Sequence, residues 1–226
     1  MRRGPLRSAI LLLVLGAPGY AQTDPPIHRV EFEVGGGLVG GASLGSADAN
    51  LRANATTKQP SRLFTTATTM SSARTVHARI GYALNRRFAI EGGAVFSRPA
   101  VRTSASGDAE GAPALTVDER VDQYFVEASI LVSLDEIRLG RRTVPFLAGG
   151  AGYLRQLHQG LTLIEEGHVY HLGGGLKHWL LARDRGFVRA AGLRADARLY
   201  VLMSGISFDE RPRPHGLASG SFFLAF

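Results

Sequence analysis

The sequence predicts an all-β protein, an eight-stranded antiparallel up-and-down transmembrane β-barrel. Three observations lead to this fold class: segments with apolar residues at every second position recur along the chain, long and short connections alternate between them, and the last ten residues form an apolar strand that ends in Phe226. A period of two gives each strand one apolar and one polar face. In a membrane barrel the apolar face meets lipid and the polar face lines the interior.

The beginning of the chain resembles a signal peptide. Three arginines precede a short apolar run at residues 9–17, and the small residues Gly19 and Ala21 suit cleavage after Ala21. The run is too short to span a bilayer, and no later segment approaches the roughly 20 apolar residues of a membrane helix. We therefore expect a signal peptide at 1–21 and a barrel domain at 22–226.

The strands are expected where apolar and polar residues alternate. Eight such segments follow one another: Arg29–Ser43, Arg74–Leu84, a third strand from Phe88 to about Pro99, Arg120–Leu134, Thr143–Arg155, His168–Ala182, a seventh around Leu193–Met203, and Leu217–Phe226. In the fifth strand, Phe146 and Leu147 compete for the lipid side.

The connections alternate in length. Four long polar loops are expected at Leu44–Ala73, Ser104–Val117, Gln156–Gly167 and Phe208–Gly216. The first has room for strand-like extensions near its end, where Thr and Ser are dense. Tight turns are expected at Asn85–Arg87, around Gly140 and at Arg183–Gly186. In bacterial barrels the short turns face the periplasm and the long loops face outward.

Taken together, these features resemble the small OmpA/OmpX-like barrels of bacterial outer membranes over nearly the whole mature chain. The resemblance implies a monomer in the outer membrane of a Gram-negative-type bacterium, in contact with outer-membrane lipids and lipopolysaccharide. It also implies an assembly signal for the barrel-assembly machinery in the closing strand, carried by Phe222, Leu224 and Phe226. A soluble lipocalin-like barrel is the structural alternative, with its apolar face inside.

Glycine favours the membrane barrel, because small residues on the charged face make room for long side chains inside a narrow barrel. The glycines expected there are Gly35, Gly37, Gly81, Gly93, Gly149, Gly173, Gly175 and Gly192.

The polar faces carry nearly balanced charge, which predicts a salt-bridge network that fills the lumen, since an unpaired buried charge costs several kcal/mol. The alternative is a narrow ion path gated by the same pairs. The expected network consists of Glu31, Glu33, Arg79, Glu91, Glu127, Lys177, Arg194, Asp196 and Arg198.

Metal and cofactor sites are not expected. His168 and His171 lie three residues apart, which puts them on opposite faces of a strand. The glycine pattern at 35–40 matches a dinucleotide motif only formally, because no acidic residue occurs between Asp48 and Glu91. The chain has no cysteine, which excludes a disulfide framework and thiol chemistry.

Enzymatic activity is not expected either. Barrels that resemble the lipid A deacylases carry a serine close to a histidine on a lipid-facing strand, whereas here His171 is followed by Leu-Gly and His178 by Trp-Leu.

The surface charges suggest contacts with anions. The net charge of +7 falls to +4 without the leader, which leaves 23 basic and 19 acidic residues. No motif points to nucleic acid. The loop cations Lys58, Arg62, Arg102, Arg211 and Arg213 could contact lipopolysaccharide phosphates or an external ligand, or could simply be solvated. The turn arginines 86, 87, 138, 141, 142, 183 and 185 would anchor the barrel to anionic head groups of the inner leaflet.

The sequence therefore favours a non-enzymatic outer-membrane barrel with a structural or surface-interaction role. The alternatives are a small passive pore and, after it, a lipid A-modifying enzyme.

Overall fold

The computed structural model describes residues 29–51, 61–108, 111–137, 139–140, 142–158, 164–183, 185–204 and 213–226. The expected signal peptide lies outside these residues.

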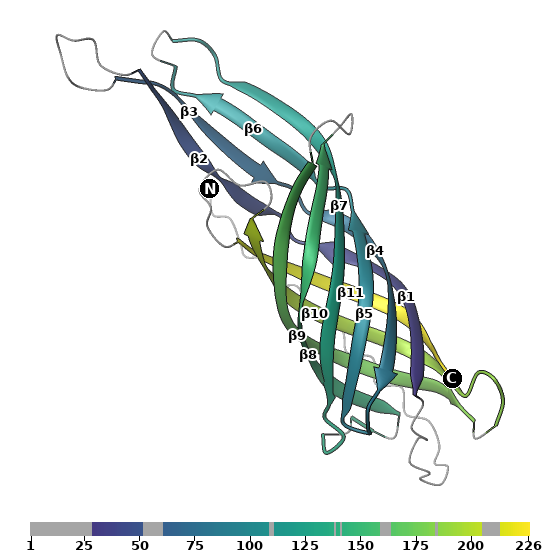
Figure 1. The fold of residues 1–226 in the computed structure, drawn as a ribbon. Helices are drawn as coiled ribbons and strands as arrows, with labels where there is room; N and C mark the ends of the chain where they lie inside the picture. The colour runs from purple at the N-terminus through teal and green to yellow at the C-terminus, as the bar shows by residue number, and fades with distance from the viewer. Residues whose placement is uncertain are drawn as a thin grey trace, which may run out of the picture.

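Eight strands close into an antiparallel barrel (Figure 1). The order around the wall is β7-β5-β4-β1-β11-β10-β9-β8, and β8 pairs back onto β7, which removes every edge from the wall. The strands are β1 (Val30–Val39), β4 (Ala73–Ala83), β5 (Phe88–Ser97), β7 (Leu115–Ser133), β8 (Thr143–His158), β9 (Ile164–Ala182), β10 (Ala190–Ser204) and β11 (Arg213–Ala225). The predicted fold class is confirmed.

Three further strands build a sheet beyond one end of the barrel, which we call the outer extension. It consists of β2 (Ala42–Leu51), β3 (Ser61–Met70), β6 (Ala100–Ser106) and residues 115–120 of β7, paired in that order. Figure 1 shows it leaning away from the barrel axis at the end opposite the short turns.

The loop predictions are wrong over most of this sheet, whereas the strand-like extensions expected near the end of the first loop are confirmed by β3. Much of the expected loop Leu44–Ala73 is the β2–β3 hairpin, and the expected loop Ser104–Val117 contains the end of β6 and the start of β7. The expected first strand also divides, because β1 ends at Val39 and β2 begins at Ala42. The cause is long-range pairing: β3 pairs with β6, so small polar residues with weak strand signals are held in a four-stranded sheet.

The other two long loops are shorter than expected. β8 continues to His158 and β9 begins at Ile164, while β11 begins at Arg213. The expected loop positions 159–163 and 205–212 lie outside the described residues.

The predicted alternation of faces is confirmed along most strands. On β7, for example, Tyr124, Val126 and Ile130 are exposed, whereas Phe125 and Glu127 are buried. On β8 the structure decides between the two competitors: Phe146 is buried and Leu147 is 52% exposed. Because of this phase, Gly149 faces outward against Leu172, and its placement on the charged face was wrong.

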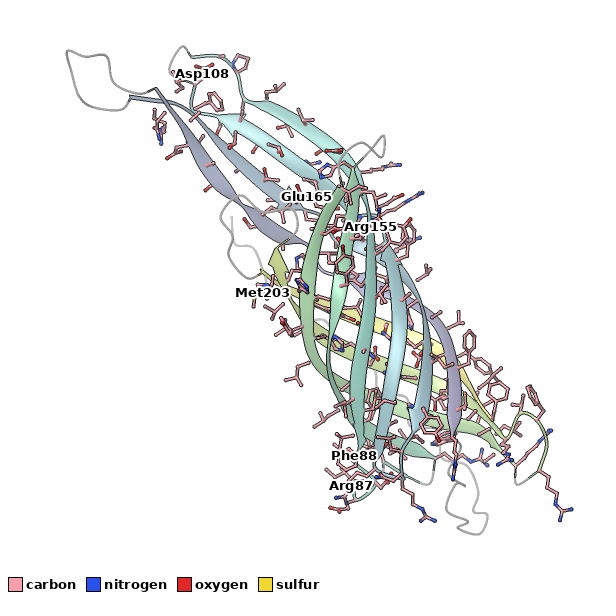
Figure 2. All side chains as sticks on the ribbon, in the orientation of Figure 1. Arg87, Phe88, Asp108, Arg155, Glu165 and Met203 are labelled. Atoms are coloured by element: carbon pink, nitrogen blue, oxygen red, sulfur yellow. The ribbon has the colours of Figure 1, made fainter. Side chains whose placement is uncertain are left out.

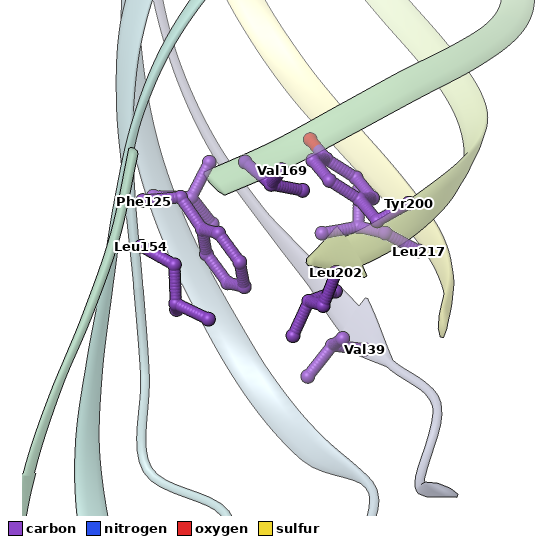
Figure 3. Packing of buried hydrophobic residues seen from close by; sticks show 8 residues of the cluster. Val39, Phe125, Leu154, Val169, Tyr200, Leu202 and Leu217 are labelled. Atoms are coloured by element: carbon purple, nitrogen blue, oxygen red, sulfur yellow. The ribbon is translucent and has the colours of Figure 1, made fainter. Parts of the chain in front are cut away.

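Apolar side chains fill both ends of the lumen. Figure 3 shows the cluster at the end that carries the outer extension, formed by Val39, Val95, Phe125, Leu154, Val169, Tyr200, Leu202 and Leu217. A smaller cluster of Leu131, Phe146 and Ala148 packs with Ala89 near the short turns. A third, of Leu44, Met70, Val101 and Val121, joins the outer extension to the barrel. The fully buried charged residues lie between the first two clusters.

Candidate functional site: the charged barrel interior

Seven of the wall strands supply charged or polar side chains to the middle of the lumen. The strand register places these residues on the inner face, because they alternate with exposed apolar neighbours on the same strand. The structure brings all nine residues of the expected network into ion pairs: Glu31, Glu33, Arg79, Glu91, Glu127, Lys177, Arg194, Asp196 and Arg198.

Arg194 is the centre of this network. Its Nη1 lies 2.7 Å from Glu33 Oε2 and 2.5 Å from Glu91 Oε2, and its Nη2 lies 2.9 Å from Asp196 Oδ2. The guanidinium also lies over the Phe146 ring, 4.5 Å from the ring centroid. Its side chain is fully inaccessible to solvent. One cation thus joins three carboxylates from three strands.

Arg79 and Arg198 extend the network to either side. Arg79 Nη1 lies 2.8 Å from Glu33 Oε1, while Arg198 bonds to Glu127 Oε1 at 2.7 Å and to Glu91 Oε1 at 3.0 Å. Every member of this central group is at most 6% exposed. Shared carboxylates and charge-assisted hydrogen bonds therefore offset the cost of removing these charges from water.

A separate pair lies nearer the short turns. Lys177 Nζ is 2.5 Å from Glu31 Oε1, and both side chains retain 16% of their accessible surface. Lys177 also lies 5.5 Å from the centroid of the Phe223 ring, which is fully buried. This pair is the partly hydrated inner end of the network.

Uncharged side chains complete the hydrogen bonding of the carboxylates, and the network expected from the sequence did not include them. Tyr200 donates to Glu127 at 2.7 Å, Ser221 donates to Glu33 at 2.7 Å, and Ser219 donates to Asp196. Their position in the alternating pattern could have identified them in the sequence, because each one alternates with lipid-facing residues on β10 or β11.

One group resembles a hydrolase triad in its order of contacts. Ser129 Oγ lies 2.9 Å from His171 Nε2, and His171 Nδ1 lies 3.6 Å from Glu127 Oε2. However, Glu127 is already bonded to Arg198 and Tyr200, and Ser129 is only 5% exposed. In this setting the three groups serve as interior hydrogen-bonding residues.

Glycines provide the space that the arginines occupy. A Cβ at Gly93 would lie 2.7 Å from Arg79 Cγ, and a Cβ at Gly173 would lie 2.9 Å from Arg198 Cγ. A methyl group at either position would collide with a buried guanidinium stem. The glycine content of the inner face is therefore a steric requirement of the network.

The outer face of the wall is apolar. Figure 2 shows side chains projecting from the wall, with Phe88 at the short-turn end. On β5, Phe88 and Phe96 both face outward and are eight residues apart, or about 20 Å along the axis of a tilted barrel. Aromatic residues flank this band near both ends, among them Phe32, Tyr82, Phe88 and Phe222 at one end and Phe96, Tyr124 and Tyr153 at the other.

An apolar outside, aromatic margins and a closed hydrogen-bonded wall satisfy what a bilayer requires of a spanning chain. This is a membrane-spanning barrel. Closed antiparallel barrels of this kind are the architecture of Gram-negative outer membranes, so the chain belongs in that membrane. A lipocalin-like arrangement is excluded, because it would put the charges outside.

Comparison with known proteins adds three solved structures. Neisserial surface protein A, from Neisseria, matches with 10% identity over 86% of this chain and 97% of its own, at a TM-score of 0.48. Ail of Yersinia pestis, in complex with the heparin analogue sucrose octasulfate, matches with 11% identity over 86% of this chain and 99% of its own, at a TM-score of 0.41. The outer membrane protein OprG of Pseudomonas aeruginosa matches with 11% identity over 88% of this chain and 97% of its own, at a TM-score of 0.46. No family model and no curated protein matches the chain.

The charges of the outer extension lie on its surface and are partly paired. Arg102 donates two hydrogen bonds to Asp118, at 2.7 and 3.0 Å, and these lower the pKa of the Asp118 carboxyl. Arg98 is bonded in the same way to Asp122 at the outer end of the barrel. Of the expected loop cations, Arg62 is exposed on β3; Lys58 and Arg211 lie outside the described residues, as does the side chain of Arg213.

The described residues contain no group of three His, Cys, Asp or Glu side chains placed to hold a metal ion. No helix in that part of the chain is long and apolar enough to cross a membrane.

Proposed function

We propose that this protein is a non-conducting outer-membrane barrel that acts as a structural element of the membrane and presents the outer extension for surface contacts. The observation that supports it best is the filling of the lumen by three successive layers.

The charged layer resists ion passage, because its cations are already held by the carboxylates of other strands. A passing ion would have to separate pairs as close as the 2.5 Å contact between Arg194 and Glu91. Removing one partner of a buried pair costs about 3–5 kcal/mol. Such a barrier opposes a steady current.

The apolar layers add a second barrier on each side of the charges. Toward the outside, Phe125 and Leu154 are at most 3% exposed, and toward the short turns Leu131 and Phe146 are at most 3% exposed. Closely packed apolar constrictions exclude water and ions. These layers favour the plugged barrel over the small passive pore.

The outer extension supports the surface role. It carries small polar residues and paired charges on one face, whereas Phe64, Leu115 and Val117 are exposed on the other, the face continuous with the lumen lining. A sheet that projects beyond the apolar band offers both faces to the exterior. Contacts with lipopolysaccharide or another external ligand through this sheet are part of the proposal, as is assembly by the barrel-assembly machinery through the closing strand.

Two measurements test the proposal. Electrophoresis with and without boiling should show a band shift, because a folded barrel resists detergent. Planar bilayer recording on the same shifted material should show no unitary conductance. Steady channels that disappear in Arg194→Met would contradict the plugged barrel and support the small passive pore.

A separate measurement concerns the structural role. Cells without the protein should take up a fluorescent hydrophobic dye faster, and expression of the wild-type chain should reverse the effect. Unchanged dye uptake would leave surface contact as the remaining role.

A further inference from the structure

The lipid-facing wall is hollowed across β4, β5, β7 and β8. The groove has a volume of about 670 Å³, within the range of pockets that hold small ligands. Its floor consists of three outward-facing small residues, Gly92, Ala128 and Gly149, and its sides include Ile80, Ile90 and Ile130. These isoleucines are 47–58% exposed, so they stand out from the wall beside the floor.

The groove lies in the half of the wall next to the short turns. Tyr82 and Ile90 line it and flank the β4–β5 turn at residues 84–87, while Val30 lines it at the first position of β1. The short turns of bacterial barrels face the periplasm, so the groove faces the inner leaflet, which contains phospholipid. Tyr82 at the margin presents an apolar ring and a polar hydroxyl at head-group depth.

The end of the barrel beside the groove is positively charged. Arg87 is labelled at this end in Figure 2. Within the described residues, this end carries seven exposed arginines, namely Arg29, Arg86, Arg87, Arg142, Arg183, Arg185 and Arg189. The acidic side chains described in the β7–β8 turn are Asp135 and Glu136, and Glu136 pairs with Arg87 at 2.6 Å.

Arg29, Arg86 and Arg87 lie within four residues, in the sequence, of side chains that line the groove. Arg29 precedes Val30, and its carbonyl accepts a hydrogen bond from the Ala83 amide, which ties it to the β4–β5 turn that holds Arg86 and Arg87. An apolar groove with cations at its head-group end is complementary to one kind of molecule in the leaflet, a lipid with an anionic head group.

We propose that the groove binds an acyl chain of an anionic phospholipid of the inner leaflet, whose phosphate lies against Arg29, Arg86 and Arg87. The acyl chain is slender enough to lie on the floor between the isoleucines, whereas the wall of a second barrel is broad and convex. The proposal goes beyond the structural role and depends on the barrel lying in the outer membrane with its short turns toward the periplasm.

The floor provides a matched pair of variants. A Cβ at Gly92 would have no neighbour nearer than the Glu127 carbonyl oxygen at 4.0 Å, and a Cβ at Gly220, on the outer face of β11, meets only the Arg194 carbonyl oxygen at 4.0 Å. Leucine therefore fits the wall equally well at both positions. Only Gly92→Leu fills the groove.

The experiment is native mass spectrometry of the full barrel in detergent, with equal amounts of dioleoyl phosphatidylglycerol and dioleoyl phosphatidylethanolamine. The wild-type barrel should retain one phosphatidylglycerol in preference to phosphatidylethanolamine. Gly92→Leu should lower that retention about tenfold, as expected when a fitted apolar pocket is filled, and Gly220→Leu should leave it unchanged. Equal retention by the two leucine variants, or a dimer that only Gly92→Leu abolishes, would overturn the proposal.

The head-group part is tested with charge variants. Arg86→Gln and Arg87→Gln should each lower the preference for phosphatidylglycerol by about fivefold, whereas Arg185→Gln, in the β9–β10 turn, should not. Equal effects of all three would mean a diffuse attraction by the whole charged end and would refute the site. Each variant must show the band shift on boiling; loss of that shift in the wild-type chain would instead count against the barrel itself.

Discussion

Replacing Arg194 by methionine should destabilise the barrel strongly, and the structure indicates by how much. Methionine keeps much of the apolar stem of the side chain, but it removes a guanidinium that lies over the Phe146 ring and within 2.9 Å of three carboxylates. Breaking a buried ion pair by removing one partner costs about 3–5 kcal/mol. That is a large part of the roughly 5–15 kcal/mol by which folded proteins are stable.

The remaining arginines limit the loss. Glu33 keeps Arg79 at 2.8 Å, and Glu91 keeps Arg198 at 3.0 Å. The carboxylates are therefore not left wholly unpaired, so the lower part of the range is expected, about 3 kcal/mol. Removing a negative charge as well should recover part of the lost stability. The double variant Arg194→Met with Glu33→Gln should therefore lose less unfolding free energy than the sum of the two single variants.

Urea unfolding in lipid vesicles is the assay, followed by the fluorescence of Trp179. It is the only tryptophan in the chain and lies edge-on to the buried Phe223, with ring centroids 4.8 Å apart. Arg102→Gln, which removes an exposed pair of the outer extension, is the control and should not change the unfolding curve. An unfolding free energy for Arg194→Met within about 1 kcal/mol of wild type would refute the buried network as a source of stability.

Three further predictions concern the wall, the outer apolar layer and the outer extension. Gly93→Ala should reduce the heat-shifted folded band, because its Cβ would lie 2.7 Å from a buried arginine stem, whereas Gly92→Ala next to it meets nothing within 3.9 Å and should fold normally. Phe125→Ala should lower the unfolding free energy by about 3–5 kcal/mol, since it removes a ring that is 3% exposed; a loss below 1 kcal/mol would mean that the layer is loosely packed. Acidification should loosen the β6–β7 pairing locally, because Arg102 lowers the pKa of Asp118. The ion pair is therefore fully formed at any pH above the ordinary pKa of an aspartate, and it is lost as the pH falls through the lowered pKa. Hydrogen exchange of the β6 amides should rise at low pH in wild type and be insensitive to that change in Arg102→Gln.

The barrel wall could be predicted from the sequence because its signal is local. Alternation with a period of two places Val126 and Ile130 outward and Glu127 inward, whichever strands are their neighbours. The members of the interior network could be named for the same reason, since a residue's face follows from its position on the strand. The alternation failed to decide only where two apolar residues adjoin, as at Phe146 and Leu147.

Tertiary structure alone decided which residues pair and where strands form without an alternating pattern. The pairs of Arg194 with Glu33 and Glu91 join residues 161 and 103 positions apart, and only the order of strands around the closed wall brings them together. The outer extension is the second case: β3 and β6 are rich in threonine, serine and alanine, whose strand preference depends on their neighbours. The groove is the third, because Gly92, Ala128 and Gly149 form one floor only after β5, β7 and β8 are in register. A local pattern determines which way a side chain faces, whereas its partner depends on pairing between distant strands, and that is a property of the folded barrel alone.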